Sequence, residues 1–97
     1  MNTEKILALG NIWEKEGKKR IYISIEKLEE IFGLKYTKYN SGSVSGAELN
    51  GSSISNKKAT DLIFNIKFSK TYYDFSDNQI HSNMNELKTA IENYINN

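Results

Sequence analysis

The sequence predicts an α+β fold, as a single domain over residues 1–97 with a mainly antiparallel sheet and about four helices. Three observations predict it. The length of 97 residues suits one small domain. Short runs of β-branched and aromatic residues alternate with segments whose apolar residues recur every three or four positions. Turns that contain glycine or asparagine separate the strand-like runs at hairpin distances.

The N-terminal segments are predicted to form a short helix and a hairpin. Thr3 is the expected cap of a helix over residues 4–9. Strands are expected at residues 13–15 and 19–24, joined across residues 16–18, where glycine supplies the freedom that a tight connection needs. We expect Trp13 to join the core.

A central helix follows the hairpin. Ser24 is its expected N-cap and Gly33 its expected end. Its apolar residues have the spacing of one buried helical face. They are Ile25, Leu28, Ile31 and Phe32.

The second half of the chain predicts further strands and two helices. Residues 34–40 alternate as a strand, residues 41–46 form a flexible connection, and a ragged strand leads to the turn at Asn50-Gly51. Ser55 is the expected N-cap of a helix that extends to about residue 65.

The C-terminal segments predict a second hairpin and a final helix. The hairpin strands are expected at residues 71–75 and 79–82. Only one of Tyr72 and Tyr73 is expected in the core, because neighbours on a strand face opposite ways. Asn83 is the expected cap of the last helix, with Glu86 completing a capping box.

Composition narrows the setting in which the protein acts. The chain contains no cysteine, and no apolar run approaches the roughly 20 residues that a membrane helix needs. The N-terminus lacks the basic-then-apolar order of a secretory signal. We therefore expect a cytoplasmic protein without a membrane partner.

Residue usage indicates a source for the chain, whereas its net charge selects no class of partner. Thirteen basic and twelve acidic side chains nearly cancel, so bulk charge does not select a polyanionic partner. Lysine, asparagine and isoleucine dominate, whereas arginine occurs once and proline never. This bias is typical of AT-rich genomes and indicates a low-GC bacterium, or one of its phages or plasmids.

The candidate catalytic and metal-binding residues are few. No segment has the spacing of a phosphate-binding loop or a nucleophile elbow. His81 is the single histidine, which excludes a cluster of histidine ligands, and its place on a strand favours a structural role. The carboxylate pairs Glu29-Glu30 and Asp74-Asp77 do not follow a calcium-loop pattern. We therefore expect no enzyme, no metal site and no cofactor.

Basic and aromatic residues interleave on the strands that flank the central helix. Cations contact phosphates and rings stack on bases in single-stranded nucleic-acid binding, but the same residue types are enriched at protein interfaces. No RNA-binding signature matches the spacing, so both partner classes stay open. The candidate partner-binding residues are Lys18, Lys19, Arg20, Tyr22, Lys35, Tyr36, Lys38 and Tyr39.

Several short motifs between residues 6 and 80 carry a family resemblance. They are Trp13-Glu14-Lys15, Gly17, Arg20-Ile21-Tyr22, Tyr39-Asn40-Ser41-Gly42, Leu49-Asn50-Gly51, Ile54-Ser55-Asn56 with Ala59, and Tyr72-Tyr73-Asp74. On these motifs the chain resembles a family of small bacterial and phage proteins with no established activity. The resemblance implies a mobile-element origin and assigns no site.

Two functions are favoured by these observations. The first is a non-enzymatic binding protein of phage or mobile-element origin that inhibits a host protein or ribonucleoprotein, for example a CRISPR effector or another defence protein. The alternative is a protein that binds single-stranded RNA or DNA through the same strands. An enzyme centred on His81 is the least favoured hypothesis. A homodimer, formed through a sheet edge or the last helix, is compatible with a domain of this size.

Overall fold

The computed structural model describes residues 2–97, which fold into four helices and seven antiparallel strands. This confirms the predicted α+β class. The elements are α1 (Thr3–Leu7), β1 (Gly10–Lys15), β2 (Lys18–Ile23), α2 (Ile25–Phe32), β3 (Leu34–Lys38), β4 (Val44–Leu49), β5 (Ser52–Ile54), α3 (Asn56–Lys67), β6 (Tyr72–Asp74), β7 (Gln79–His81) and α4 (Asn85–Asn96). None of the helices in residues 2–97 is long and apolar enough to cross a bilayer.

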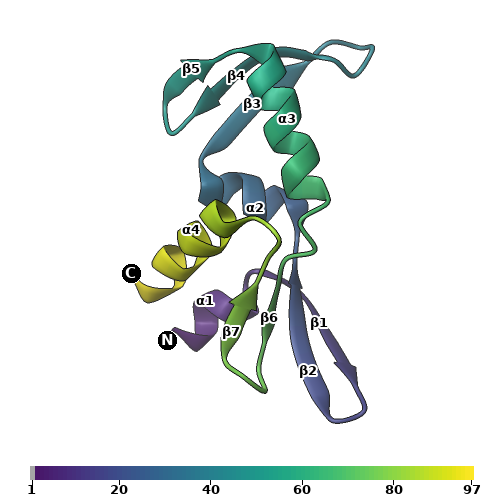
Figure 1. The fold of residues 1–97 in the computed structure, drawn as a ribbon, viewed down its shortest axis with the longest axis vertical. Coiled ribbons are helices and arrows are strands. Elements are labelled where there is room, and N and C mark those ends of the chain that lie inside the picture. The colour runs from purple at the N-terminus through teal and green to yellow at the C-terminus, as the bar shows by residue number, and fades with distance from the viewer. Residues whose placement is uncertain (1) are drawn as a thin grey trace.

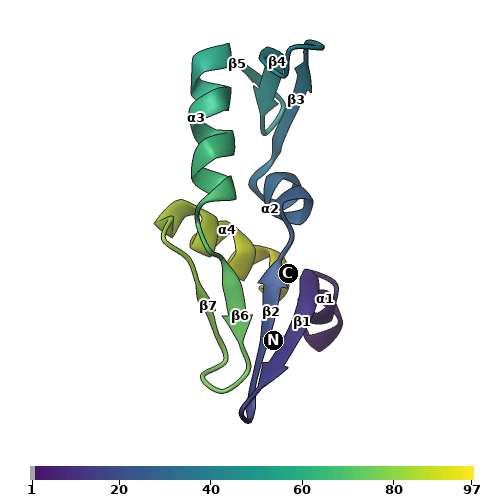
Figure 2. The ribbon, with the colours of Figure 1, turned by 90° about the vertical axis from the view of Figure 1, so that its right-hand side faces the viewer.

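The strands form two separate sheets rather than one. A four-stranded sheet has the order β1-β2-β6-β7, and a three-stranded sheet has the order β3-β4-β5. The sheets occupy opposite ends of an elongated molecule of 44 × 27 × 20 Å, with α2 between them (Figure 1). Helices α1 and α4 lie on one face of the four-stranded sheet, and α3 lies along one face of the three-stranded sheet (Figure 2).

One hydrophobic core joins the two ends. Apolar residues of the four-stranded sheet pack against α1 and α4, and Leu28 of α2 with Leu34 of β3 continues the same cluster toward the second sheet. The fully buried large side chains are Leu9, Ile21, Ile66, Ile80, Leu87, Ile91 and Ile95. Burial of these side chains, at about 25 cal/mol per Å² of apolar surface, holds the helices onto the sheets.

The β1–β2 hairpin places Trp13 outside the core, contrary to the prediction. Its turn contains only Glu16 and Gly17, both with positive φ (54° and 78°), and Lys15 pairs with Lys18. Trp13 therefore lies opposite Arg20. A connection across residues 16–18 would have placed it opposite the buried Ile21, so a register difference of one residue moves the ring to the other face.

The boundaries of α2 and α3 agree with their sequence signals. The Ser24 hydroxyl accepts a hydrogen bond from the N–H of Lys27 (3.2 Å), and Gly33 ends α2 in the left-handed conformation. The Ser55 hydroxyl accepts from the N–H of Lys58 (3.1 Å) in the same way. Both predicted N-caps are therefore confirmed.

The first and last helices begin differently from the prediction. The side chain of Asn2, and not Thr3, caps α1 by accepting a hydrogen bond from Lys5 (3.2 Å). Helix α4 begins after Met84, which makes no side-chain cap, so the predicted capping box is absent. Asn83 instead donates its backbone N–H to the carbonyl of Ser69 (3.1 Å), which ties the chain to the end of α3.

The C-terminal hairpin forms, with strands shorter than predicted. Strands β6 and β7 have three residues each. Tyr73 is the buried tyrosine and donates its hydroxyl to Asn78 (3.0 Å), whereas Tyr72 lies on the opposite face. The expectation that one of the two tyrosines is core is confirmed.

Candidate functional site

The eight sequence-predicted residues fall into two groups that lie in different sheets. The first group is on β2 and consists of Lys18, Lys19, Arg20 and Tyr22. The second group is on β3 and the residue after it, and consists of Lys35, Tyr36, Lys38 and Tyr39. Because the sheets lie at opposite ends of the molecule (Figure 1), the two groups do not form one strand surface.

The second group is dispersed further within its own sheet. Lys35 pairs with Glu48 on an exposed face, whereas Tyr36 points the other way and is half-buried. Tyr36 donates its hydroxyl to Oε1 of Glu29 (3.0 Å). Burial, and then this bond to a carboxylate, raise the pKa of Tyr36 above its ordinary value. Tyr36 therefore supports the packing of β3 against α2.

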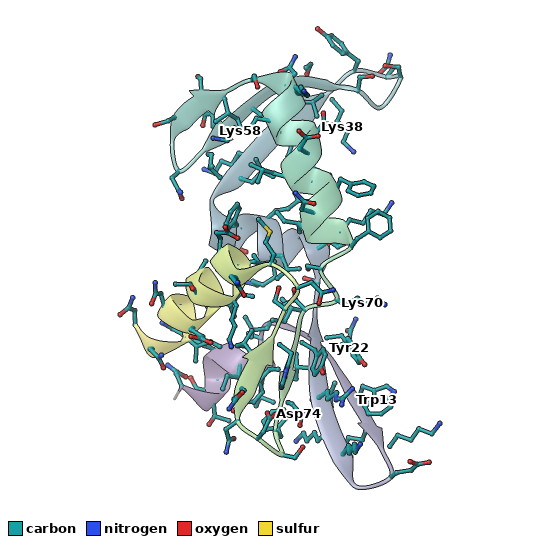
Figure 3. The ribbon with its side chains drawn as sticks, viewed as in Figure 1. Trp13, Tyr22, Lys38, Lys58, Lys70 and Asp74 are labelled. Carbon is teal, nitrogen blue, oxygen red and sulfur yellow. The ribbon has the colours of Figure 1, made fainter. Side chains whose placement is uncertain are left out.

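Of the remaining two members, Lys38 lies near the start of α3. Lys38 and Lys57 line one shallow, open hollow. Lys38 and Lys58 are labelled in Figure 3 at this end of the molecule. Tyr39 follows β3 and is 62% exposed, the most exposed large hydrophobic side chain of the described chain. This is a small basic surface with one free ring.

The first group belongs to a larger surface on the four-stranded sheet. In β2, Lys18, Arg20 and Tyr22 share one face, while Lys19 faces the other way, with its Nζ 4.8 Å from the ring centroid of Phe75. The strand register places residues of all four strands beside the first three. We call this surface the open face, and its residues are Asn11, Trp13, Lys15, Lys18, Arg20, Tyr22, Tyr72, Asp74, Gln79 and His81.

The open face carries a row of rings, one from each strand. Trp13 meets Tyr22 edge-on (ring centroids 6.3 Å apart), and Tyr22 meets Tyr72 at 5.6 Å. Tyr72 stacks on His81, with centroids 4.9 Å apart and planes inclined by 21°. Figure 3 shows Trp13 and Tyr22 on the side of the sheet away from α1 and α4. Such ring pairs contribute about 0.5–1.5 kcal/mol each beyond the area they bury, so neighbouring rings of the row stabilise one another.

Arg20 lies within this row and contacts two of its rings. Its guanidinium carbon is 4.5 Å from the ring centroid of Tyr72 and 5.7 Å from that of Trp13. Its Nε donates to Oδ2 of Asp74, its cross-strand neighbour, at 3.1 Å. The guanidinium is therefore fixed by an ion pair as well as by the rings.

Asp74 holds Arg20 in this position. It is buried, and its Oδ1 accepts hydrogen bonds from both the backbone N–H (2.9 Å) and the hydroxyl of Ser76. The bonds from Ser76, and then the Arg20 guanidinium, hold the pKa of Asp74 below its usual value. A hydrogen bond with Tyr22, and then Asp74, raise the pKa of Arg20. Both groups are charged across the physiological range.

Asp74, Asp77 and His81 form the one three-residue group in residues 2–97 that has metal-ligating atoms close together. Their ligand atoms lie within 4.8 Å of one another, and Nε2 of His81 is 2.9 Å from Oδ2 of Asp77. Both oxygens of Asp74 already accept hydrogen bonds from Ser76 and Arg20. The positive guanidinium beside them disfavours a cation. The geometry therefore fits hydrogen bonding better than metal binding.

Comparison of the chain with protein-family models, with curated proteins and with solved structures finds no significant match. No relative therefore assigns a role to any residue. The open face and the basic surface beside α3 are the two surfaces that bear on its function.

Sequence reasoning found part of the open face and missed the rest. The sequence predicts Lys18, Arg20 and Tyr22 as partner-binding residues, but it predicts Trp13 in the core and a structural role for His81. The Glu16-Gly17 pair carries the missing signal, because a two-residue turn fixes the register that sets Trp13 opposite Arg20. No local pattern predicts that Tyr72 lies next to Arg20, because the two residues are far apart in the chain.

Proposed function

We propose that the chain is a non-enzymatic binding protein that recognises and blocks a host protein through the open face. The observation that carries this proposal is Arg20, held by Asp74 between the rings of Trp13 and Tyr72. Arginine, tryptophan and tyrosine are the residue types that dominate the binding energy of protein interfaces. A surface that is rigid before binding also loses less conformational entropy when a partner docks.

The arrangement of the rings favours a protein over a nucleic acid as the partner of this face. Because β2 and β7 flank β6, Arg20 and His81 approach Tyr72 from opposite sides. The two faces of this ring are thus occupied, while base stacking needs a free face. The face carries three cations, Lys15, Lys18 and Arg20, and Arg20 is paired with Asp74, so only two lysines are left to hold phosphates.

The residue composition of the chain supports a phage or mobile-element origin. Its AT-biased residue usage indicates a low-GC bacterium or one of its phages or plasmids. Mobile elements in such hosts encode small proteins that inhibit host components, and a CRISPR effector or another defence protein is the class of target that we propose. Inhibition by steric blocking requires no catalytic residue.

A capture experiment with matched variants tests the proposal. The tagged chain is incubated with the lysate of a low-GC bacterium, beside a Trp13→Ala/Tyr22→Ala variant. The control is Phe64→Ala/Phe68→Ala, which removes two exposed rings from α3. We expect one host protein in stoichiometric amount with the wild type and the control, and its loss with the open-face variant. Equal recovery with all three chains, or no stoichiometric protein, would contradict the proposal.

A second candidate function, binding of single-stranded nucleic acid, is favoured by a different observation. Lys38 and Lys57 line one hollow, and Tyr39, the residue after Lys38, has an exposed ring. Mixed-sequence oligonucleotides at low salt test it, because phosphate-driven binding weakens steeply as salt rises. A Lys38→Gln/Lys57→Gln variant should lose this binding, while Lys67→Gln, at the other end of α3, should retain it. Absence of binding at low salt removes this candidate.

A further inference from the structure

The two sheets leave four strand edges within residues 2–97, and these edges are not equivalent. Strands β5 and β7 have only three residues each. The β3 edge carries Lys35 and Lys38, and next to Lys38 its pairing with β4 shifts register, with Ser45 of β4 as the extra residue. Short length, irregularity and lysine are devices that keep sheet edges from pairing with other chains. Three of the four edges are protected in one of these ways.

The edge formed by β1 is the longest of the four, and its single lysine, Lys15, is its last residue. It has six residues that pair with β2 without any register shift. Ile12 and Trp13 point to opposite faces of the sheet, and both are exposed, Ile12 by 52%. Figure 2 shows β1 as the outermost strand of its sheet, with no further strand beside it. A regular edge with apolar side chains on both faces is typical of a strand that accepts a partner strand.

The hydrogen bonds of β2 identify the free backbone groups of β1. The N–H of Ile23 donates to Thr71 (3.2 Å), and the carbonyl of Lys19 accepts from Phe75 (3.0 Å), so the odd-numbered residues of β2 face β6. The even-numbered residues of β2 therefore face β1, where they pair with Asn11, Trp13 and Lys15. By alternation, the N–H and carbonyl groups of Gly10, Ile12 and Glu14 point to the free edge.

We propose that two copies of the chain pair through β1, antiparallel and about a two-fold axis, with Ile12 opposite Ile12 of the second copy. In this register Gly10 lies opposite Glu14 of the second copy, so every free group of each edge finds a partner. If the second copy is shifted by two residues in either direction, some of the free N–H and carbonyl groups of β1 have no partner. The inference does not depend on the function proposed above.

The side chains of β1 are compatible with this antiparallel register. Glu14 lies opposite the small Gly10 of the second copy, whereas a parallel in-register pairing would place two Glu14 carboxylates side by side. The two exposed Ile12 side chains cover each other. On the open face, Trp13 is diagonal to Trp13 of the second copy, at the ~7–8 Å that long aromatic side chains bridge. The dimer would join the two ring rows into one continuous surface.

Cysteine cross-linking tests the register directly, because the chain has no cysteine of its own. Directly opposite residues of a hydrogen-bonded pair have Cα atoms about 5.5 Å apart, within the range that a disulfide spans. Ile12→Cys should therefore form a covalent dimer under mild oxidation. The matched control is Lys35→Cys, an exposed position on the edge strand β3. Equal rates of cross-linking at the two positions would overturn the proposed register.

Complementary charges test whether the pairing exists in solution. The wild type should gain mass toward a dimer with concentration in sedimentation or light scattering. Ile12→Lys and Ile12→Glu should each remain monomeric, with circular dichroism confirming that they fold, and their mixture should recover the dimer. A wild type that stays monomeric at every concentration, or a mixture that stays monomeric, would overturn the proposal.

Discussion

Nε of Arg20 lies 3.1 Å from Oδ2 of Asp74, directly across the β2–β6 pair. Asp74 is itself fixed by two hydrogen bonds from Ser76 in the β6–β7 connection. The β6–β7 hairpin therefore sets the position of the Arg20 guanidinium between Trp13 and Tyr72, although this hairpin lies far from Arg20 in the sequence. The ion pair therefore stabilises the pairing of β2 with β6 and also holds Arg20 in its position on the open face.

The Arg20–Asp74 pair predicts a loss of stability in acid. The pKa of Asp74 lies below its ordinary value of 3.8, through the bonds from Ser76 and then through Arg20. A carboxyl with a depressed folded-state pKa stabilises the fold above its unfolded pKa, and this contribution is lost as pH falls through the folded pKa. We expect the free energy of unfolding to fall below about pH 4, and to fall less steeply in Asp74→Asn.

Urea unfolding at a series of pH values, from about pH 7 to about pH 2, measures this effect. Ser76→Ala provides the second comparison, because it removes the hydrogen bond that contributes most to the shift. Its slope should lie between those of the wild type and Asp74→Asn. Identical slopes in all three proteins would show that Asp74 does not govern acid stability.

Arg20 is predicted to be a main binding residue for the proposed host protein. Arg20→Ala should weaken binding by about 2 kcal/mol or more, the usual size for a central interface arginine. Arg20→Lys should restore little of it, because an ammonium keeps the charge without the planar stacking. Titration calorimetry with the captured protein measures both variants.

Lys67→Ala is the matched control for Arg20→Ala. Nζ of Lys67 lies 5.8 Å from the ring centroid of the exposed Phe68, so this residue also places a cation near a ring, but in the other half of the molecule. It should bind as tightly as the wild type. If Arg20→Ala and Lys67→Ala bind equally well, the partner does not use the open face.

Local signals in the sequence were sufficient to predict most of the elements and the two ends of α2. Ser24 and Gly33 delimit α2 as expected, because a hydroxyl N-cap and a left-handed glycine act within one turn of helix. The turn at Asn50-Gly51 likewise forms with positive φ at both residues. These features depend only on residues a few positions apart.

The division into two sheets and the composition of the open face depend on pairings that local patterns do not encode. Strands β2 and β6 pair although about half of the chain separates them. Trp13 is apolar enough for the core, and only the length of its turn places it on the open face. The candidate surface on β2 and β3 was therefore predicted as one surface, although the two strands belong to different sheets.

Gly33→Ala is predicted to destabilise the fold by about 1–2 kcal/mol. Gly33 has φ of 81°, and an added Cβ would clash with Oδ1 of Asn50. The Asn50 side chain can move, so the backbone conformation sets most of the cost. The control is Gly46→Ala, where the nearest atom, Oγ1 of Thr37, is 3.7 Å away and φ is ordinary. Denaturant unfolding should separate the two variants, and equal losses would contradict this explanation.

Leu28→Ala is predicted to destabilise both ends of the molecule together. Leu28 is 2% exposed and belongs to the core that continues from the four-stranded sheet into β3. Its truncation should lower the free energy of unfolding by about 2–5 kcal/mol, whereas Leu7→Ala, at an exposed leucine, should change it by less than about 0.5 kcal/mol. Trp13 fluorescence reports the four-stranded sheet, and far-ultraviolet circular dichroism reports the whole chain. Because one core joins the two sheets, the two signals should change at the same denaturant concentration. Separate transitions would mean that the sheets unfold independently and that α2 does not couple them.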